Sequence, residues 1–292
     1  MAPATRDRWA EWLAERRFGG DPEVRAEVLA RLTEVRDTVL DRAELRKGET
    51  LLDVGCGEGL IGFGALERGA GSVIFSDIST DLLDFCREAA AELGVLDRCE
   101  FVEAAADDIG SIDAGSVDVV TTRSVLIYVK EKAEAFGEFA RVLRSGGRIS
   151  LWEPINRFGS RERREGGFVG YPVEGLDEVV AKLMAVVEAI QHPDTDPMLD
   201  FDERDLLRLA EEAGFSPLRL TLDARVEPPE PRSWDGFLDT AWNPNVPTLR
   251  EAMNQALAPD ERERLAMQLR SLVEWGEGER RMAFAHLSGV RA

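Results

Sequence analysis

Residues 51–62 read Leu-Leu-Asp-Val-Gly-Cys-Gly-Glu-Gly-Leu-Ile-Gly, and they give the strongest indication of the fold. It starts as a short apolar run, passes through closely spaced glycines and continues as an apolar-periodic stretch to Arg68. Glycines at such a turn let the backbone adopt positive φ and let a ligand approach without a Cβ in the way. The stretch therefore predicts a strand, a glycine turn and a helix, with a flat or polar ligand bound at the turn.

Two kinds of cofactor bind at turns of this type, and the charges around the turn help to choose between them. Gly57, Gly59 and Gly62 satisfy the G-x-G-x-x-G string of dinucleotide sites, which is a weak signal when it stands alone. Asp53, inside the strand, would repel a pyrophosphate but favour a sulfonium or ammonium group. Asp77, at the end of the next strand, could accept the ribose hydroxyls of either cofactor. The pattern favours a cationic adenosyl cofactor and leaves a nicotinamide oxidoreductase as an alternative.

Alternation of strands and helices continues on both sides of this stretch. Short strands separated by helices of 10–15 residues predict a parallel sheet covered on both faces. The expected strands are 50–54, 72–76, 100–103, 117–121, 148–152, 217–226 and 282–290, and the expected helices are 5–17, 22–44, 80–93, 131–144, 176–191, 203–213, 248–257 and 260–275.

The alternation of strands and helices is interrupted at several places, and these interruptions predict the domain organisation. After Glu153 the chain becomes rich in Gly and Arg, and the helix that follows has no strand directly after it, which is typical of an insertion. We expect this insertion and the N-terminal helices to form a lid beside the strand ends. The expected parts are N-terminal helices over 1–44, a cofactor-binding core over 45–155, a lid insertion over 156–201, and the rest of the core over 202–292 with a helical insertion at 228–278.

Several motifs follow one another in a fixed order between about residues 45 and 155. They are Leu-Asp-Val-Gly-Cys-Gly-Glu-Gly at 52–59, Asp77 at the end of the second strand, the acidic pair after the third, Val-Asp-Val-Val-Thr-Thr at 117–122 leading to Ser124, and Arg-Val-Leu-Arg-Ser-Gly-Gly-Arg at 141–148. This ordered set resembles the class I S-adenosylmethionine-dependent methyltransferases. The resemblance implies a Rossmann-like, doubly wound α/β fold with a seven-stranded sheet whose last strand is antiparallel.

The same resemblance implies positions for the cofactor, S-adenosylmethionine, which leaves as S-adenosylhomocysteine. The methionyl part would lie against Gly55, Gly57 and Leu60 near Asp53, the ribose against Asp77, the adenine against Ile78, Ala106 and Asp107, and the transferred methyl near Arg123 and Ser124. Many relatives carry an Asp where this chain has Ala105, so the adenine contact is expected to shift.

Composition argues against nucleic acids, membranes and metals as partners. A formal net charge of −20 disfavours a nucleic-acid substrate, and no apolar run approaches the ~20 residues of a bilayer span. Three widely spaced cysteines form neither a disulfide framework nor a zinc signature, so no metal is expected. The start of the chain lacks the apolar region of a secretory signal, and the expected location is the cytoplasm. The sequence does not select an oligomeric state, and a homodimer stays open.

Candidate catalytic residues are Tyr128, His192 and Glu153. Tyr128 follows the fourth strand, His192 ends the lid helix, and Glu153 ends the fifth strand, beyond which open α/β sheets bind ligands. Tryptophans outside the core suggest a small apolar or aromatic acceptor, such as a natural product or a quinone, methylated in line on O, C or N. The alternative is a protein of the same fold that binds the cofactor without transferring methyl, such as a cyclase or a regulatory binder.

Overall fold

The computed structural model describes residues 6–19, 22–160, 167–192 and 195–292, which divide into two compact units. The sheet unit comprises residues 28–155, 201–223 and 284–292. The insertion unit comprises the described residues of 1–27, 156–200 and 224–283. Residues 28–44, which the sequence placed with the N-terminal helices, therefore belong with the sheet.

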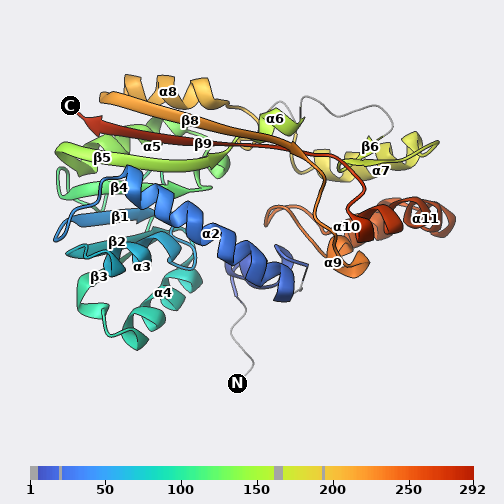
Figure 1. The fold of residues 1–292 in the computed structure, drawn as a ribbon, viewed down its shortest axis with the longest axis horizontal. Helices are drawn as coiled ribbons and strands as arrows, with labels where there is room; N and C mark the ends of the chain where they lie inside the picture. Colours follow the sequence, from blue (N-terminus) through green and yellow to red (C-terminus); the bar gives the residue numbers. More distant parts are fainter. Residues whose placement is uncertain (1–5, 20–21, 161–166, 193–194) are drawn as a thin grey trace. The chain divides into compact units, whose positions relative to one another are not determined.

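A seven-stranded sheet with the order β3-β2-β1-β4-β5-β9-β8 forms the framework of the sheet unit (Figure 1). Strands β1 to β5 pair in parallel, whereas β9 pairs antiparallel with β5. The expected α/β sheet with its antiparallel last strand is confirmed. The strands are β1 (Thr50–Val54), β2 (Ser72–Asp77), β3 (Cys99–Glu103), β4 (Val117–Arg123), β5 (Leu143–Pro154), β8 (Phe215–Glu227) and β9 (Arg280–Arg291).

Helices pack along this sheet between consecutive strands. Helix α3 packs on β1 and β2, α4 packs on β2 and β3, and α5 packs on β5 and on α8. None of the described helices is both long and apolar enough to cross a membrane. The helices that contribute to the sheet unit are α2 (Pro22–Arg42), α3 (Leu60–Glu67), α4 (Thr80–Glu92), α5 (Lys132–Val142) and α8 (Glu203–Glu212), with the 3-10 turns η2 (Leu96–Arg98) and η3 (Leu126–Tyr128).

The strand order reverses at β1, and this reversal positions the site. The chain moves outward from β1 to β3 and then returns to β4 on the other side of β1. Open α/β sheets bind ligands at such a switch point, beyond the carboxyl ends of the strands. The register places Asp53 of β1 beside Thr121 of β4, and Val54 beside Ser76 of β2. Polar side chains on neighbouring strands are thus brought together at one edge.

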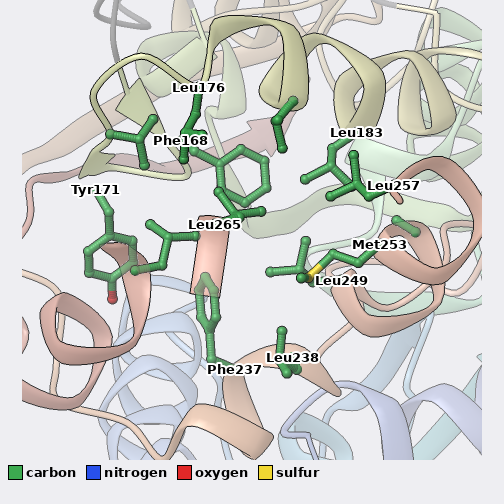
Figure 2. Close-up of a cluster of buried hydrophobic side chains, with 14 of the residues drawn as sticks. Phe168, Tyr171, Leu176, Leu183, Phe237, Leu238, Leu249, Met253, Leu257 and Leu265 are labelled. Atoms are coloured by element: carbon green, nitrogen blue, oxygen red, sulfur yellow. The ribbon is translucent and has the colours of Figure 1, made fainter. Parts of the chain in front are cut away.

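The insertion unit has its own apolar core, which Figure 2 shows in close-up. Leu265, Leu269 and Val273 of α11 are fully buried there, and Phe168, Leu183 and Met253 are nearly so. The unit contains α1 (Arg8–Glu11), the π-helix η1 (Trp12–Arg16), α6 (Asn156–Ser160), β6 (Gly167–Phe168), β7 (Tyr171–Pro172), α7 (Asp177–Glu188), α9 (Trp234–Leu238), α10 (Leu249–Ala256) and α11 (Pro259–Trp275).

Several short elements of this unit were not expected from the sequence. Strands β6 and β7 form a hairpin whose two loop residues, Val169 and Gly170, have φ of 51° and 86°. Positive φ at both positions is the geometry of a type I′ turn, for which Asn-Gly or Asp-Gly is the usual signal. A β-branched residue gives no such signal. The expected helix over 5–17 is also interrupted, because α1 ends at Glu11 and the chain continues as a π-helix.

Candidate active site

The glycine turn after β1 adopts the backbone that its sequence predicts. Gly55, Gly57 and Gly59 have φ of 63°, 55° and 79°, which lie in the left-handed region. A Cβ added to Gly55 would lie 2.4 Å from Cγ2 of Val125, so the turn also passes close to another part of the chain. The amide of Cys56 donates to the carbonyl of Ser76 at 2.9 Å and ties the turn to β2.

Asp77 joins the glycine turn to the start of α4. Its Oδ2 accepts a hydrogen bond from the amide of Gly57 at 2.9 Å, and its Oδ1 accepts one from the amide of Ser79 at 3.0 Å. The hydroxyl of Ser79 caps α4 by accepting from the amide of Leu82 at 3.1 Å. An ionised carboxylate offers about four acceptor positions, and the contact of Asp77 with ribose hydroxyls stays a prediction.

Asp53 lies beneath the turn with 2% of its surface exposed. Its Oδ2 accepts from the amide of Gly62 at 3.0 Å, and its Oδ1 accepts from the hydroxyl of Thr121 at 3.1 Å. Burial raises the pKa of Asp53 to about 7, while the bonds from Thr121 and Gly62 and the charge of Arg123 partly oppose that shift. A cation bound nearby would therefore favour the ionised form of this carboxyl near neutral pH.

The residues expected at the adenine follow β2 and β3 at the same edge of the sheet. Ile78, directly after β2, is 47% exposed, which leaves an apolar side chain available for a flat ligand. Ala106 is buried and Asp107 is half-buried, within a turn where the amide of Asp108 donates to the carbonyl of Ala105 at 3.1 Å. Because these strands are parallel, their ends lie beside the glycine turn.

Arg123 ends β4 and is half-buried. Burial lowers the pKa of its guanidinium, and the charges of Asp53, Glu153 and Tyr128 act against that shift. These neighbours belong to β1, β5 and η3, so Arg123 lies among the charged groups at the carboxyl ends of the strands. The sheet unit thus brings Arg123 together with the glycine turn.

Glu153 has no exposed surface. Its Oε1 accepts from the hydroxyl of Thr122 at 2.8 Å and from the amide of Val125 at 3.1 Å. Burial raises the pKa of Glu153 to about 7, although these hydrogen bonds favour its ionised form. Its Oε2 is buried without a hydrogen-bond partner among the described residues, so the expected contact of Glu153 with the acceptor stays a prediction.

The other two candidate catalytic residues lie in different units. Tyr128 ends η3 in the sheet unit and is half-buried. His192 is exposed and belongs to the insertion unit, four residues beyond the last residue of α7, Glu188. The expected helix therefore ends before it reaches His192. A catalytic role stays a prediction for both residues.

Four residues that the sequence did not single out support the site. Thr121 bonds Asp53, Thr122 and Val125 bond Glu153, and Ser79 bonds Asp77 through its amide. The sequence signal that could have identified Thr121 and Thr122 is the pair of consecutive threonines near the end of an apolar strand. All three cysteines are free, and among the described residues no three His, Cys, Asp or Glu side chains gather as metal ligands.

Comparison with known proteins gives the family. Residues 52–151 match a family model described as a methyltransferase domain. Nocamycin O-methyltransferase of Saccharothrix syringae is 31% identical over 234 residues, covering 76% of this chain and 81% of that enzyme. The ubiquinone/menaquinone biosynthesis C-methyltransferase of Pseudomonas putida is 29% identical over 60% of this chain and 68% of that enzyme. The chain belongs to the class I S-adenosylmethionine-dependent methyltransferases.

Other matches cover less of the relative or show the fold alone. The tRNA 5-carboxymethoxyuridine methyltransferase of Escherichia coli is 36% identical over 101 residues, but the chain covers only 38% of it. The chain likewise covers 34% of an uncharacterised transposon protein of Streptomyces fradiae. A structure of geranyl diphosphate methyltransferase with its cofactor superposes with a TM-score of 0.54 at 19% identity, covering 99% of this chain and 96% of that chain.

Proposed function

We propose that this protein binds S-adenosylmethionine at the carboxyl edge of its sheet unit and transfers the methyl group to a small molecule. The glycine turn carries the argument, because a Cβ at Gly55 would meet Val125 and three glycines hold left-handed φ. Two carboxylates flank that turn, Asp53 beneath it and Asp77 beside it. This arrangement suits a cation attached to a ribose better than it suits a pyrophosphate.

The residues present fit the parts of this cofactor. Gly55, Gly57 and Leu60 would line the methionyl part, with Asp53 and Arg123 nearby. Asp77 would accept from the ribose hydroxyls. Ile78 would pack on the adenine ring, while Ala106 and Asp107 would hold its polar edge.

The cofactor supplies an electrophilic methyl group on a sulfonium, so the protein's main task is to orient an acceptor atom and exclude water. Tyr128 is the candidate for a contact with the acceptor from the sheet unit. A general base is needed only where the acceptor keeps its proton at neutral pH. His192 is the candidate for that proton transfer.

The proposed acceptor is a small apolar or aromatic molecule, methylated on O, C or N. Nocamycin O-methyltransferase and the ubiquinone/menaquinone biosynthesis C-methyltransferase are relatives whose names indicate small-molecule acceptors. The net charge of −20 also disfavours polyanionic acceptors such as nucleic acids.

Incubating the full chain with S-adenosylmethionine and a panel of small phenols, polyketides and quinones tests this proposal. Mass spectrometry should detect an acceptor that gains one methyl group, together with S-adenosylhomocysteine. A parallel incubation with an Asp77→Ala variant is the matched control and should give little product. Tight cofactor binding without product on any acceptor would favour the non-methylating binder instead.

A further inference from the structure

The turn between β4 and η3 is held from β5 through two neighbouring residues. The carboxylate of Glu153 accepts from the amide of Val125 at 3.1 Å, and the carbonyl of Trp152 accepts from the amide of Ser124 at 2.8 Å. Ser124 has a φ of 58°, a left-handed conformation that is strained for a non-glycine residue. Such a conformation persists only where surrounding contacts enforce it.

Glu153 supplies the one of these two contacts that comes from a side chain. Its side chain is 0% exposed, and it also accepts from the hydroxyl of Thr122 at 2.8 Å. Val125 begins the segment that η3 continues, and the amide of Tyr128 donates back to the carbonyl of Val125 at 2.9 Å. The carboxylate thus fixes the first amide of a turn that ends at Tyr128.

Val125 connects this turn to the cofactor turn. Its Cγ2 lies 2.4 Å from the position that a Cβ on Gly55 would occupy, so the valine side chain lies directly against the glycine backbone. Any movement of the Val125 backbone would therefore alter the space beside Gly55. One chain of contacts leads from Glu153 through Val125 to the glycine turn, and all its members belong to the sheet unit.

We propose that Glu153 is a positioning residue for the cofactor site, which holds the turn at residues 124–128 against the glycine turn without touching a substrate. This inference rests on the proposed function, because the glycine turn must bind S-adenosylmethionine. It replaces the expected contact between Glu153 and the acceptor. It also assigns to Glu153 the placement of Tyr128, the last residue of the held turn.

Calorimetry with S-adenosylhomocysteine, which needs no acceptor, tests this role. Glu153→Met removes both oxygens and leaves the Val125 amide without its carboxylate partner, which frees the turn to move. We expect the dissociation constant to rise about tenfold or more. Glu153→Gln keeps an oxygen for the same donors, and we expect the constant to stay within about threefold of the wild-type value. Thr122→Val, which removes one donor, should fall between them.

Glu49 provides a matched control, since it is also a buried carboxylate of the sheet unit. It precedes β1 at the opposite edge, accepts from the amide of Arg46 at 2.8 Å and pairs with Arg148. Glu49→Gln should lower the thermal midpoint but leave the dissociation constant within about twofold. This variant separates general destabilisation from displacement of the cofactor turn.

The outcomes distinguish the two proposals. If Glu153→Met binds S-adenosylhomocysteine as the wild type does, the positioning role is wrong and the cofactor site stands. Equal losses in Glu153→Gln and Glu153→Met would also overturn it, because the charge would then act on the ligand directly. If Glu153→Met does not fold, unchanged binding by Thr122→Val would likewise show that the positioning role is wrong. A wild-type chain that does not bind the ligand would overturn the proposed function itself.

Discussion

The side chain of Val125 lies where a side chain on Gly55 would have to go, with Cγ2 2.4 Å from the ideal Cβ position. Gly55 follows β1 and Val125 follows β4, and these two strands are neighbours at the point where the strand order reverses. The requirement for glycine at residue 55 therefore has two sources, the positive φ of the turn and the close approach of the next loop.

Gly55→Ala should both destabilise the protein and weaken cofactor binding. Left-handed φ alone costs an alanine about 1–2 kcal/mol, and the contact with Val125 adds to it. Adding Val125→Ala to Gly55→Ala should recover the stability lost through the contact, but not the stability lost through the left-handed φ. Denaturant unfolding measures both losses. Gly146→Ala is the matched control, since Gly146 has a φ of 73° and nothing within 4 Å of its Cβ position. Equal losses at the two glycines would show that the contact carries no energy.

Asp77→Ala should weaken S-adenosylhomocysteine binding about tenfold to hundredfold, because two backbone amides and the ribose would lose a charged acceptor. Asp84→Asn, on the exposed face of α4, is a suitable control and should bind normally. Isothermal titration of the two variants side by side makes the comparison. Normal binding by Asp77→Ala would show that Asp77 does not hold the ribose.

The affinity for S-adenosylmethionine relative to S-adenosylhomocysteine should rise with pH. Burial raises the pKa of Asp53 to about 7, so the carboxyl loses its proton as the pH passes from 6 to 8. Only the methyl donor carries a sulfonium charge, and the ionised form favours it. The ratio of the two dissociation constants, measured across this range, should change severalfold in the wild type and stay flat in Asp53→Asn. A flat wild-type ratio would place the sulfonium away from Asp53.

The fold was predictable from the sequence because its signals are local. Apolar runs followed by glycine or Asp define β1 and β2, and the antiparallel last strand followed from the family resemblance. Cofactor-binding candidates such as Asp53 and Asp77 could be identified from the sequence for the same reason. Asp53 lies one residue before the end of β1 and Asp77 ends β2, and parallel strand ends meet at one edge.

The supporting contacts were not predictable, because they depend on register and close packing. Thr121 reaches Asp53 only because β4 pairs with β1 in the observed register. The carboxyl-edge position of Glu153 suggested an acceptor contact, but nothing in the sequence indicates that the side chain turns toward Val125. The type I′ turn at Val169 and Gly170 likewise lacks the Asn-Gly or Asp-Gly sequence that usually predicts a hairpin.

His286 should make the protein sensitive to acid. It is 5% exposed, and its Nε2 lies 3.0 Å from the hydroxyl of Ser150, which itself donates to the carbonyl of Val39 at 2.7 Å. The hydroxyl proton is thus engaged, and Nε2 of a neutral imidazole is the donor. Burial, with the charge of Arg42, lowers the pKa of His286 from 6.5 to about 4.

The contribution of neutral His286 to the free energy of unfolding is present above pH 6.5 and decreases as the pH falls toward 4. The unfolded chain binds the proton at the higher pH, because its histidine keeps the ordinary pKa. Full protonation of His286 should lower the free energy of unfolding by about 3 kcal/mol. Urea unfolding at pH 7 and pH 4.5 should show a larger loss for the wild type than for His286→Met, which carries no titrating group. Parallel losses in both proteins would assign the acid sensitivity to other groups.

Calorimetric titration of the full wild-type chain with S-adenosylmethionine, S-adenosylhomocysteine and NAD shows which cofactor the glycine turn binds. The carboxylate-flanked glycine turn predicts that both adenosyl ligands bind with dissociation constants of about 10 μM or below, and that NAD gives no heat of binding at millimolar concentration. Binding of NAD without binding of either adenosyl ligand would contradict it.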